Sequence, residues 1–177
     1  MLFTRQSYQT IGRHSAIRNN PLDDFNLGRI TKRLGLKWVL FEGTRSVEVL
    51  AFAGNLDAFR SVSRSIFPVL NYSVSIFVLF SVVLLALGFV PIATLINEIL
   101  YPPHQMDIML VSLLSVVIVA SSWFVACRKF KHSMLTVLYY PLSIAVMWLA
   151  GCHSVFSYVF HLTNWKSRKI SKQKIRV

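Results

Sequence analysis

The chain has 177 residues, 54% of them hydrophobic, and its net charge is +12 from 19 basic and 7 acidic side chains. Ordinary soluble domains have about 45–50% apolar residues, so the excess indicates membrane segments. The basic residues gather before the first long apolar run and after the last one, as is typical of the flanks of membrane helices. We find no nucleic-acid-binding motif, and residues 1–14 lack the apolar core of a signal peptide.

The chain is organised around the apolar run at residues 66–90, and no charged residue lies between residues 69 and 90. About 20 apolar residues cross the hydrocarbon core of a bilayer, and a helix satisfies its own backbone there. We expect Pro91 to break or kink this helix. We therefore divide the chain into an N-terminal part, a membrane region and a basic tail, at residues 1–65, 66–164 and 165–177. The predicted spans lie at residues 68–90, 108–126 and 134–160.

The distribution of lysine and arginine predicts the orientation of these spans. Basic residues in the N-terminal part and at 128–131 favour the cytoplasmic side, and the loop at 101–106 has no lysine or arginine. We expect an integral protein of the cytoplasmic (inner) membrane with its N-terminal part in the cytoplasm. Three spans then place the basic tail outside, against the rule, unless the third segment is re-entrant or split.

Residues 1–65 mix helix and strand signals. A short strand is expected at residues 11–17, and further strands at residues 36–42 and 46–52. Between them, a helix begins at Asp23 as its N-cap and ends at Gly35. A second, basic helix follows, with Asn55 as its N-cap.

Neither of the two cysteines belongs to a disulfide framework or a zinc-binding motif. Cys127 and Cys152 lie in or beside apolar runs, and no CxxC motif is present. We expect both to serve in packing.

Two pairs of charged residues are candidates for chemistry. Asp23 and Asp24 open the first helix, where carboxylates are favourable charges at the positive helix end. Arg60 and Arg64 are four residues apart and project from one side of the second helix. Such a pair fits either phosphate oxygens of a substrate or the headgroups of membrane lipids.

Residues 11–43, IGRHSAIRNNPLDDFNLGRITKRLGLKWVLFEG, resemble the acceptor-side segment of membrane family-2 glycosyltransferases. The resemblance is closest to the groups that glycosylate lipids, namely the ceramide, hopanoid-associated and carotenoid glycosyltransferases. Residues 62–73 and 164–168 resemble the membrane entry and the C-terminal ending of these proteins. The matching positions of the first segment are His14, Ile17, Arg18, Asp23, Asp24, Leu27, Gly28 and Gly35.

The resemblance implies site residues. Asp24 matches the general base that deprotonates the acceptor hydroxyl, and Asp23 matches its partner. Arg60 and Arg64 would contact the leaving diphosphate, although Arg64 alone matches the QxxRW motif of many members, which disfavours a processive polymer synthase. His14 would line the acceptor pocket, or else it is an ordinary surface histidine.

The resemblance also implies what this chain lacks. The donor-binding half of the family, with its D-x-D motif for a divalent metal (Mg²⁺ or Mn²⁺), has no counterpart here, so no metal site or cofactor is expected in this chain. The expected fold is a short α/β fragment of a GT-A-type domain followed by about three transmembrane helices. The expected function is the acceptor-side, membrane-anchoring half of a lipid glycosyltransferase, inactive alone. Its partners would be membrane lipids, a lipid acceptor and a separate donor-binding chain.

The alternative is a small non-enzymatic membrane protein for interaction or assembly. Small residues on the second predicted span would pack against partner helices or within the chain's own helices. They are Ser112, Ser115, Ala120, Ser121 and Ser122. A transporter is disfavoured because His153 is the one histidine or charged residue within the three predicted spans.

Overall fold

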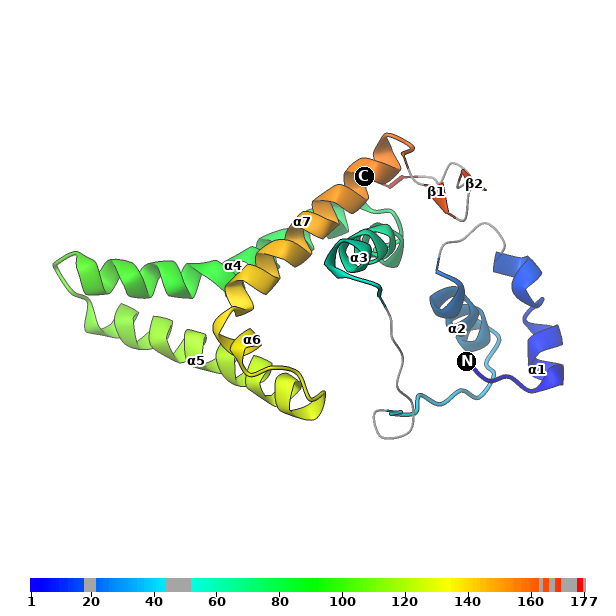
Figure 1. Ribbon diagram of the computed structural model, residues 1–177, viewed down its shortest axis with the longest axis horizontal. Coiled ribbons are helices and arrows are strands. Elements are labelled where there is room, and N and C mark those ends of the chain that lie inside the picture. The colour runs from blue at the N-terminus through cyan, green and yellow to red at the C-terminus, as the bar shows by residue number, and fades with distance from the viewer. Residues whose placement is uncertain (18–21, 44–51, 163, 166–167, 170–174, 177) are drawn as a thin grey trace. The chain divides into compact units, whose positions relative to one another are not determined.

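The computed structural model describes residues 1–17, 22–43, 52–162, 164–165, 168–169 and 175–176 (Figure 1). Its internal contacts divide the chain into two compact units. The first unit comprises Met1–Ser73 and His153–Val177, and the second comprises Val74–Cys152. Helices account for almost all regular structure in the described ranges.

Three short helices begin the first unit: α1 (Arg5–Thr10), the 3-10 helix η1 (His14–Ile17) and α2 (Asp23–Arg33). Their apolar side chains form a small core. Its buried members are Ile11, Ile17 and Leu27, and Phe3, Tyr8, Ile30 and Leu36 pack against them. The strand that we expected at residues 11–17 is wrong, because Gly12 and Arg13 adopt positive φ angles of 82° and 58° and turn the chain into η1.

The ends of α2 partly match the expectation. Gly35 has a φ of +66°, in the left-handed region that glycine enters without strain, and it follows the helix end as expected. The N-cap position is held by Leu22 without a side-chain hydrogen bond, so Asp23 is the first helical residue and not the cap. Both Asp23 and Asp24 therefore lie in the first turn, at the positive end of the helix.

The expected α/β fragment is wrong. Residues 36–43 have no regular secondary structure, and the strand expected at residues 46–52 falls almost wholly outside the described residues. Four consecutive apolar side chains, from Trp38 at 58% exposure to Phe41 at 85%, lie open to solvent. A strand needs a neighbour for its hydrogen bonds and a layer for its apolar face, and the described part of residues 1–73 supplies neither.

Helix α3 (Asn55–Val69) is the amphipathic helix expected after Asn55, but Gly54 holds its N-cap position. It ends in a tight reversal in which Asn71 and Tyr72 have φ angles of 54° and 58°. The backbone N–H of Tyr72 donates to the carbonyl of Phe67 at 3.1 Å and closes this turn. The first candidate span thus begins after the reversal and not at residue 66 or 68.

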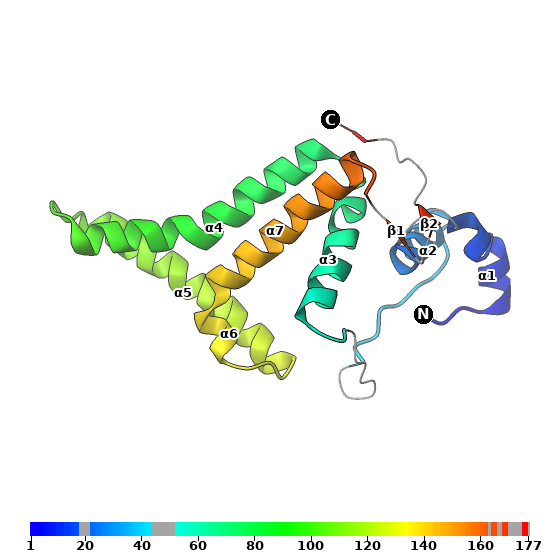
Figure 2. The same cartoon turned by 45° about the horizontal axis from the view of Figure 1, so that its top comes forward.

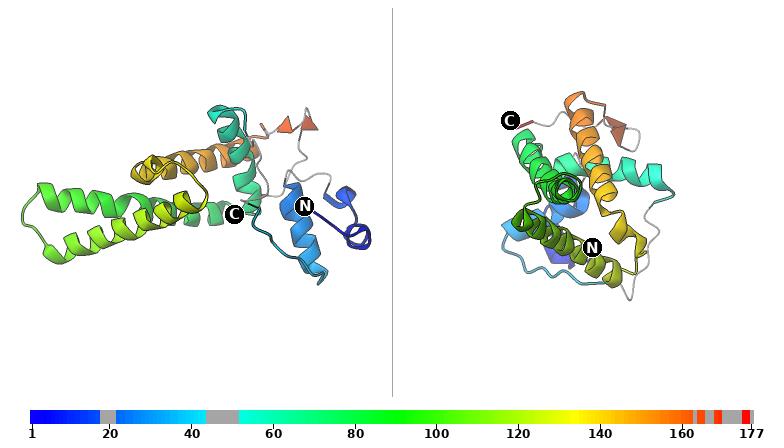
Figure 3. Two further views of the ribbon diagram at one scale, coloured as in Figure 1. Left: turned by 60° about the horizontal axis from the view of Figure 1, so that its bottom comes forward. Right: turned by 90° about the vertical axis from the view of Figure 1, so that its left-hand side faces the viewer.

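The second unit contains α4 (Val74–Leu100), α5 (Met106–Lys129), α6 (Leu135–Leu138) and most of α7 (Tyr140–Val159), which continues into the first unit. Helices α4, α5 and α7 are long and apolar enough to cross a membrane, so the predicted transmembrane helices are supported by length and composition. Figures 1 and 3 show α4 and α5 lying side by side as an antiparallel pair.

Helix α4 runs through Pro91 without ending, so of the expected break or kink the break is wrong. The hydroxyl of Thr94 is within hydrogen-bond distance of the Val90 carbonyl, at 2.9 Å, and of the Ser112 hydroxyl on α5, at 2.7 Å. Ser112 is buried and serves the packing of the chain's own helices.

The tail contributes a two-residue antiparallel pair, β1 (Asn164–Trp165) with β2 (Arg168–Lys169). Further on, the backbone N–H of Arg176 donates to the carbonyl of Tyr72 at 2.9 Å. The C-terminal tail therefore contacts the reversal that follows α3, although the two segments are far apart in the sequence.

Candidate functional site

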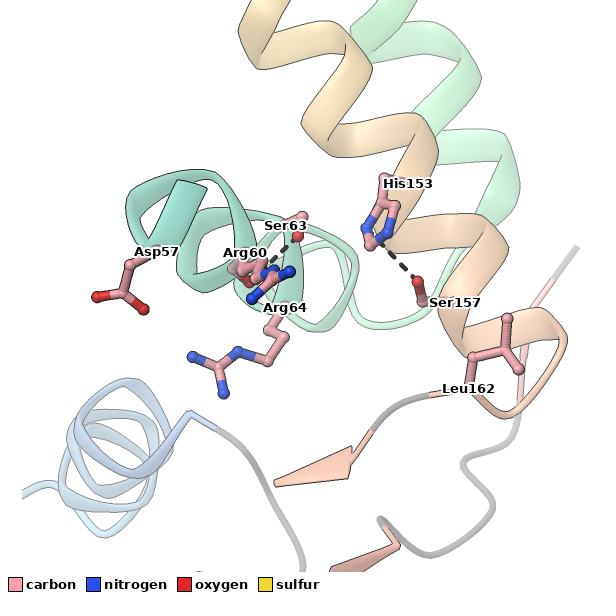
Figure 4. Close-up of a pocket in the computed structure, with 7 residues that line it drawn as sticks. All are labelled: Asp57, Arg60, Ser63, Arg64, His153, Ser157 and Leu162. Atoms are coloured by element: carbon pink, nitrogen blue, oxygen red, sulfur yellow. Dashed lines mark hydrogen bonds between the residues drawn. The ribbon is translucent and has the colours of Figure 1, made fainter. Parts of the chain in front are cut away.

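A pocket of about 570 Å³ lies within the first unit, between α3 and the C-terminal part of α7. Figure 4 shows Arg60 and Arg64 projecting from α3, and His153 on α7 pointing toward that helix. The pocket is lined by Asp57, Arg60, Ser63, Arg64, His153, Ser157 and Leu162. Arg60 and Arg64 thus share one side of α3, as their spacing predicts, and the C-terminal part of α7 provides further lining residues.

The two arginines line the pocket because they are one helical turn apart, and the apolar face of α3 is turned to the interior. Phe67 on that face is fully buried, at 0% exposure. Arg60 is exposed and Arg64 is half-buried. Within the described residues neither guanidinium makes a hydrogen bond or an ion pair.

Figure 2 shows the C-terminal part of α7 beside α3. Two hydrogen bonds join these helices: the backbone N–H of Phe67 donates to Ser154 Oγ at 3.0 Å, and the Tyr158 hydroxyl donates to the carbonyl of Arg64 at 3.0 Å. Pro68 explains the second bond: proline has no N–H, so the carbonyl four residues earlier, that of Arg64, has no helical donor. Tyr158 supplies the missing donor from another helix.

Aromatic side chains complete this contact. Tyr158 stacks its ring edge against Tyr72 at 5.4 Å between centroids, and Phe67 lies 5.7 Å from Tyr72. The hydroxyl of Tyr72 is buried without a hydrogen-bond partner in the described part of the chain. Burial raises the pKa of Tyr72 to about 12, because the charged phenolate is poorly solvated there.

His153 and Ser157 are the lining residues that we did not predict as part of a site. They are four residues apart on α7, and His153 Nδ1 lies 3.5 Å from Ser157 Oγ. The ring of Phe59 meets the His153 ring edge-on at 5.8 Å. The signal in the sequence was His153 itself, as the one histidine or charged residue in a predicted span.

The acidic pair lies elsewhere in the first unit and is not among the residues that line the pocket. Asp24 is exposed, Asp23 is half-buried, and Asp24 Oδ1 accepts the backbone N–H of Phe25 at 2.7 Å. Their helix is tied to the membrane entry, because Arg29 Nη1 donates to Asn71 Oδ1 at 2.6 Å. This bond joins α2 to the reversal that precedes the first candidate span.

His14 is also absent from the pocket lining. It belongs to η1, is exposed, and its Nδ1 makes a short hydrogen bond with the hydroxyl of Tyr8. Its backbone N–H donates to the same hydroxyl at 3.3 Å. His14 therefore has a local partner, and the small core of Ile11, Ile17 and Leu27 holds its turn beside α2.

Metal-ligating residues do not gather in the described ranges: no group of three or more His, Cys, Asp or Glu side chains is positioned to hold an ion there. Cys127 is a buried free thiol and Cys152 is a half-buried one. Comparison with known proteins adds no identification, since no protein-family model, no curated protein and no solved structure matches this chain.

Proposed function

We propose that this chain is the membrane-anchored, acceptor-side part of an enzyme that transfers a sugar from a nucleotide-sugar to the hydroxyl of a lipid. The observation that carries the proposal is the exposed carboxylate of Asp24 on a helix that Arg29 bonds to Asn71, directly before the first candidate span. A lipid acceptor presents its hydroxyl at the membrane surface, where a base must be held to meet it.

In this proposal Asp24 accepts the proton of the acceptor hydroxyl as the oxygen attacks the anomeric carbon of the sugar. The bond to the nucleoside diphosphate breaks on the opposite face, so the configuration inverts. General-base catalysis of this kind contributes about 10²–10⁴-fold to the rate. Asp23 supports the base through its neighbouring charge, and His14 lies in the turn that packs beside α2.

The described residues contain neither the expected α/β layer nor a metal site. In this proposal a donor-binding half of the enzyme supplies both, as the resemblance implies. The N-terminal part would face the cytoplasm, where nucleotide-sugars are made available.

The test is sugar transfer in membranes that contain this chain together with the polypeptide encoded beside it. Incorporation of labelled sugar from UDP-glucose into solvent-extractable lipid is measured. We expect Asp24→Asn to reduce transfer by about 10²-fold or more. Asp107→Asn, at the start of α5, removes the same charge outside the proposed site and is expected to keep wild-type activity. Equal rates for wild type and Asp24→Asn would exclude Asp24 as the base.

A second candidate is a non-enzymatic membrane protein that assembles with other subunits. The observation in its favour is that Ser121 and Ser122 on α5 are exposed, whereas Ser112 is used within the chain. Small residues on an exposed face let another helix approach closely. Native electrophoresis of detergent-extracted membranes tests this: a larger complex that Ser121→Leu disrupts, in membranes without sugar transfer, would favour assembly.

A further inference from the structure

The pocket between α3 and α7 contains more hydrogen-bond donors than the chain itself uses. Arg60 and Arg64 each carry five N–H donors, and in the described residues neither guanidinium has an acceptor. Among the described lining residues, Asp57 is the one carboxylate, and its Oδ2 atom already accepts the backbone N–H of Ala53 at 3.2 Å. The pocket is thus complementary to an anion with several acceptor oxygens.

Residues of α7 add to this character from the opposite wall. Ser157 offers a hydroxyl, and His153 offers a ring nitrogen besides the Nδ1 that faces Ser157. Guanidinium groups match the tetrahedral oxygens of phosphate with paired N–H donors, which makes arginine better suited to phosphate than lysine. The chemistry of the lining therefore favours a phosphate group.

The position of the pocket in the chain indicates where such a phosphate would come from. Arg64 lies near the end of α3 at Val69, and the first candidate span begins at Val74. A transmembrane helix enters the bilayer at the boundary between the headgroups and the hydrocarbon. Lipid phosphates lie at that level.

We propose that this pocket binds the phosphate of an anionic membrane lipid, with Arg60 and Arg64 as its main ligands and Ser157 and His153 as donors from α7. The site is separate from the acidic pair on α2. It does not depend on glycosyl transfer, and it adds two residues of the third candidate span that the sequence resemblance does not include. A soluble diphosphate has similar oxygens, so the experiment must separate the two sources.

The experiment is calorimetric titration of the purified chain in a neutral detergent. The ligands are dihexanoyl phosphatidic acid, dihexanoyl phosphatidylcholine, inorganic diphosphate and UDP. We expect phosphatidic acid to bind at least about 10-fold more tightly than phosphatidylcholine. Arg60→Gln and Arg64→Gln should each weaken binding about 10-fold or more, as is usual when a hydrogen bond between two charged groups is lost.

Three further variants make the result specific. Arg128→Gln removes the same charge from an exposed position at the end of α5 and should change the affinity by less than about 2-fold. Arg60→Lys keeps the charge and loses the paired donors, so its affinity should fall between those of wild type and Arg60→Gln. Asp24→Asn should bind as wild type does, which separates this proposal from the one on catalysis.

Several outcomes would overturn the proposal. If Arg128→Gln weakened binding as much as Arg60→Gln, the attraction would be that of a diffuse basic surface. Equal affinity for phosphatidic acid and phosphatidylcholine would exclude a phosphate-specific site. Tight binding of UDP or diphosphate without binding of phosphatidic acid would exclude the lipid source. Circular dichroism of each variant verifies that it is folded.

Discussion

The hydrogen bond from Tyr158 to the carbonyl of Arg64 offers the most direct test of how the first unit is held together. Pro68 removes the helical donor of that carbonyl, and the Tyr158 hydroxyl replaces it at 3.0 Å. Tyr158 is 5% exposed, so water does not readily reach the Arg64 carbonyl to replace the tyrosine hydroxyl as its donor. Tyr158→Phe would leave a buried carbonyl without a donor, at a cost of about 1–3 kcal/mol in the free energy of unfolding.

The substitution is conservative in every other respect. A phenylalanine keeps the ring contacts of Tyr158 with Phe67 and Tyr72, whose centroids lie at 6.0 Å and 5.4 Å. Unfolding is followed by circular dichroism in detergent micelles during titration with a denaturing detergent. Tyr139→Phe is the matched control, because Tyr139 is 59% exposed, and we expect it to change stability by less than about 0.5 kcal/mol.

A double-mutant cycle with Pro68→Ala tests the stated cause. Alanine restores an N–H that can donate to the carbonyl of Arg64 along the helix, so Tyr158→Phe should then cost less. We expect the two substitutions to be coupled by at least about 0.5 kcal/mol. Our account of Pro68 would be refuted if Tyr158→Phe had the same cost in both backgrounds, or if it cost no more than Tyr139→Phe.

Two further predictions concern buried positions. A Cβ atom at Gly88 would lie 2.8 Å from Cδ1 of Ile144, so Gly88→Val should destabilise the second unit by about 1–3 kcal/mol, and Ile144→Ala should recover part of that loss in the double variant. Tyr72→Phe removes a buried hydroxyl that has no partner in the described residues, so it should be neutral or stabilising. Burial raises the pKa of Tyr72 from 10.0 to about 12. The free energy of unfolding therefore keeps its full value below pH 10, where the phenol is neutral in both states, and it falls as the pH rises toward 12, because the unfolded state loses the proton more readily. The same unfolding titration at pH 10 and pH 12 tests this. A smaller decrease in the free energy of unfolding for Tyr72→Phe than for wild type would confirm the predicted pH dependence, whereas an equal decrease would contradict it.

The helices could be predicted from the sequence because their signals are local. The apolar stripe of α2, the glycine after it and the uncharged runs of α4, α5 and α7 each lie within one stretch of chain. The strand at residues 36–42 was wrong for the complementary reason: a strand is stable only beside another strand, and its own residues carry no information on whether one is present. The exposed side chains of Trp38 and Phe41 show the result.

Only the α3 side of the pocket could be predicted from the sequence. Arg60 and Arg64 share a helix face, and their spacing is sufficient to group them. His153 lines the pocket with them because α7 packs against α3, and these helices are about ninety residues apart in the chain. No periodic pattern in the sequence predicts that contact. Ser154, at 1% exposure, is one of three serines in α7, and its role as acceptor for Phe67 follows only from the contact itself.

Pro68 links the stability of this unit to the shape of its pocket. The carbonyl that proline leaves open belongs to Arg64, and the side chain of the same residue lines the pocket. On α7, Ser154 and Tyr158 hold α3, and the residues directly before them, His153 and Ser157, face the cavity. The contacts that join the two helices therefore position both walls before any ligand is present, which lowers the ordering cost of binding. Arginines that only flank a membrane helix need no such fixed backbone, and this difference is the reason to expect a specific anion at this site.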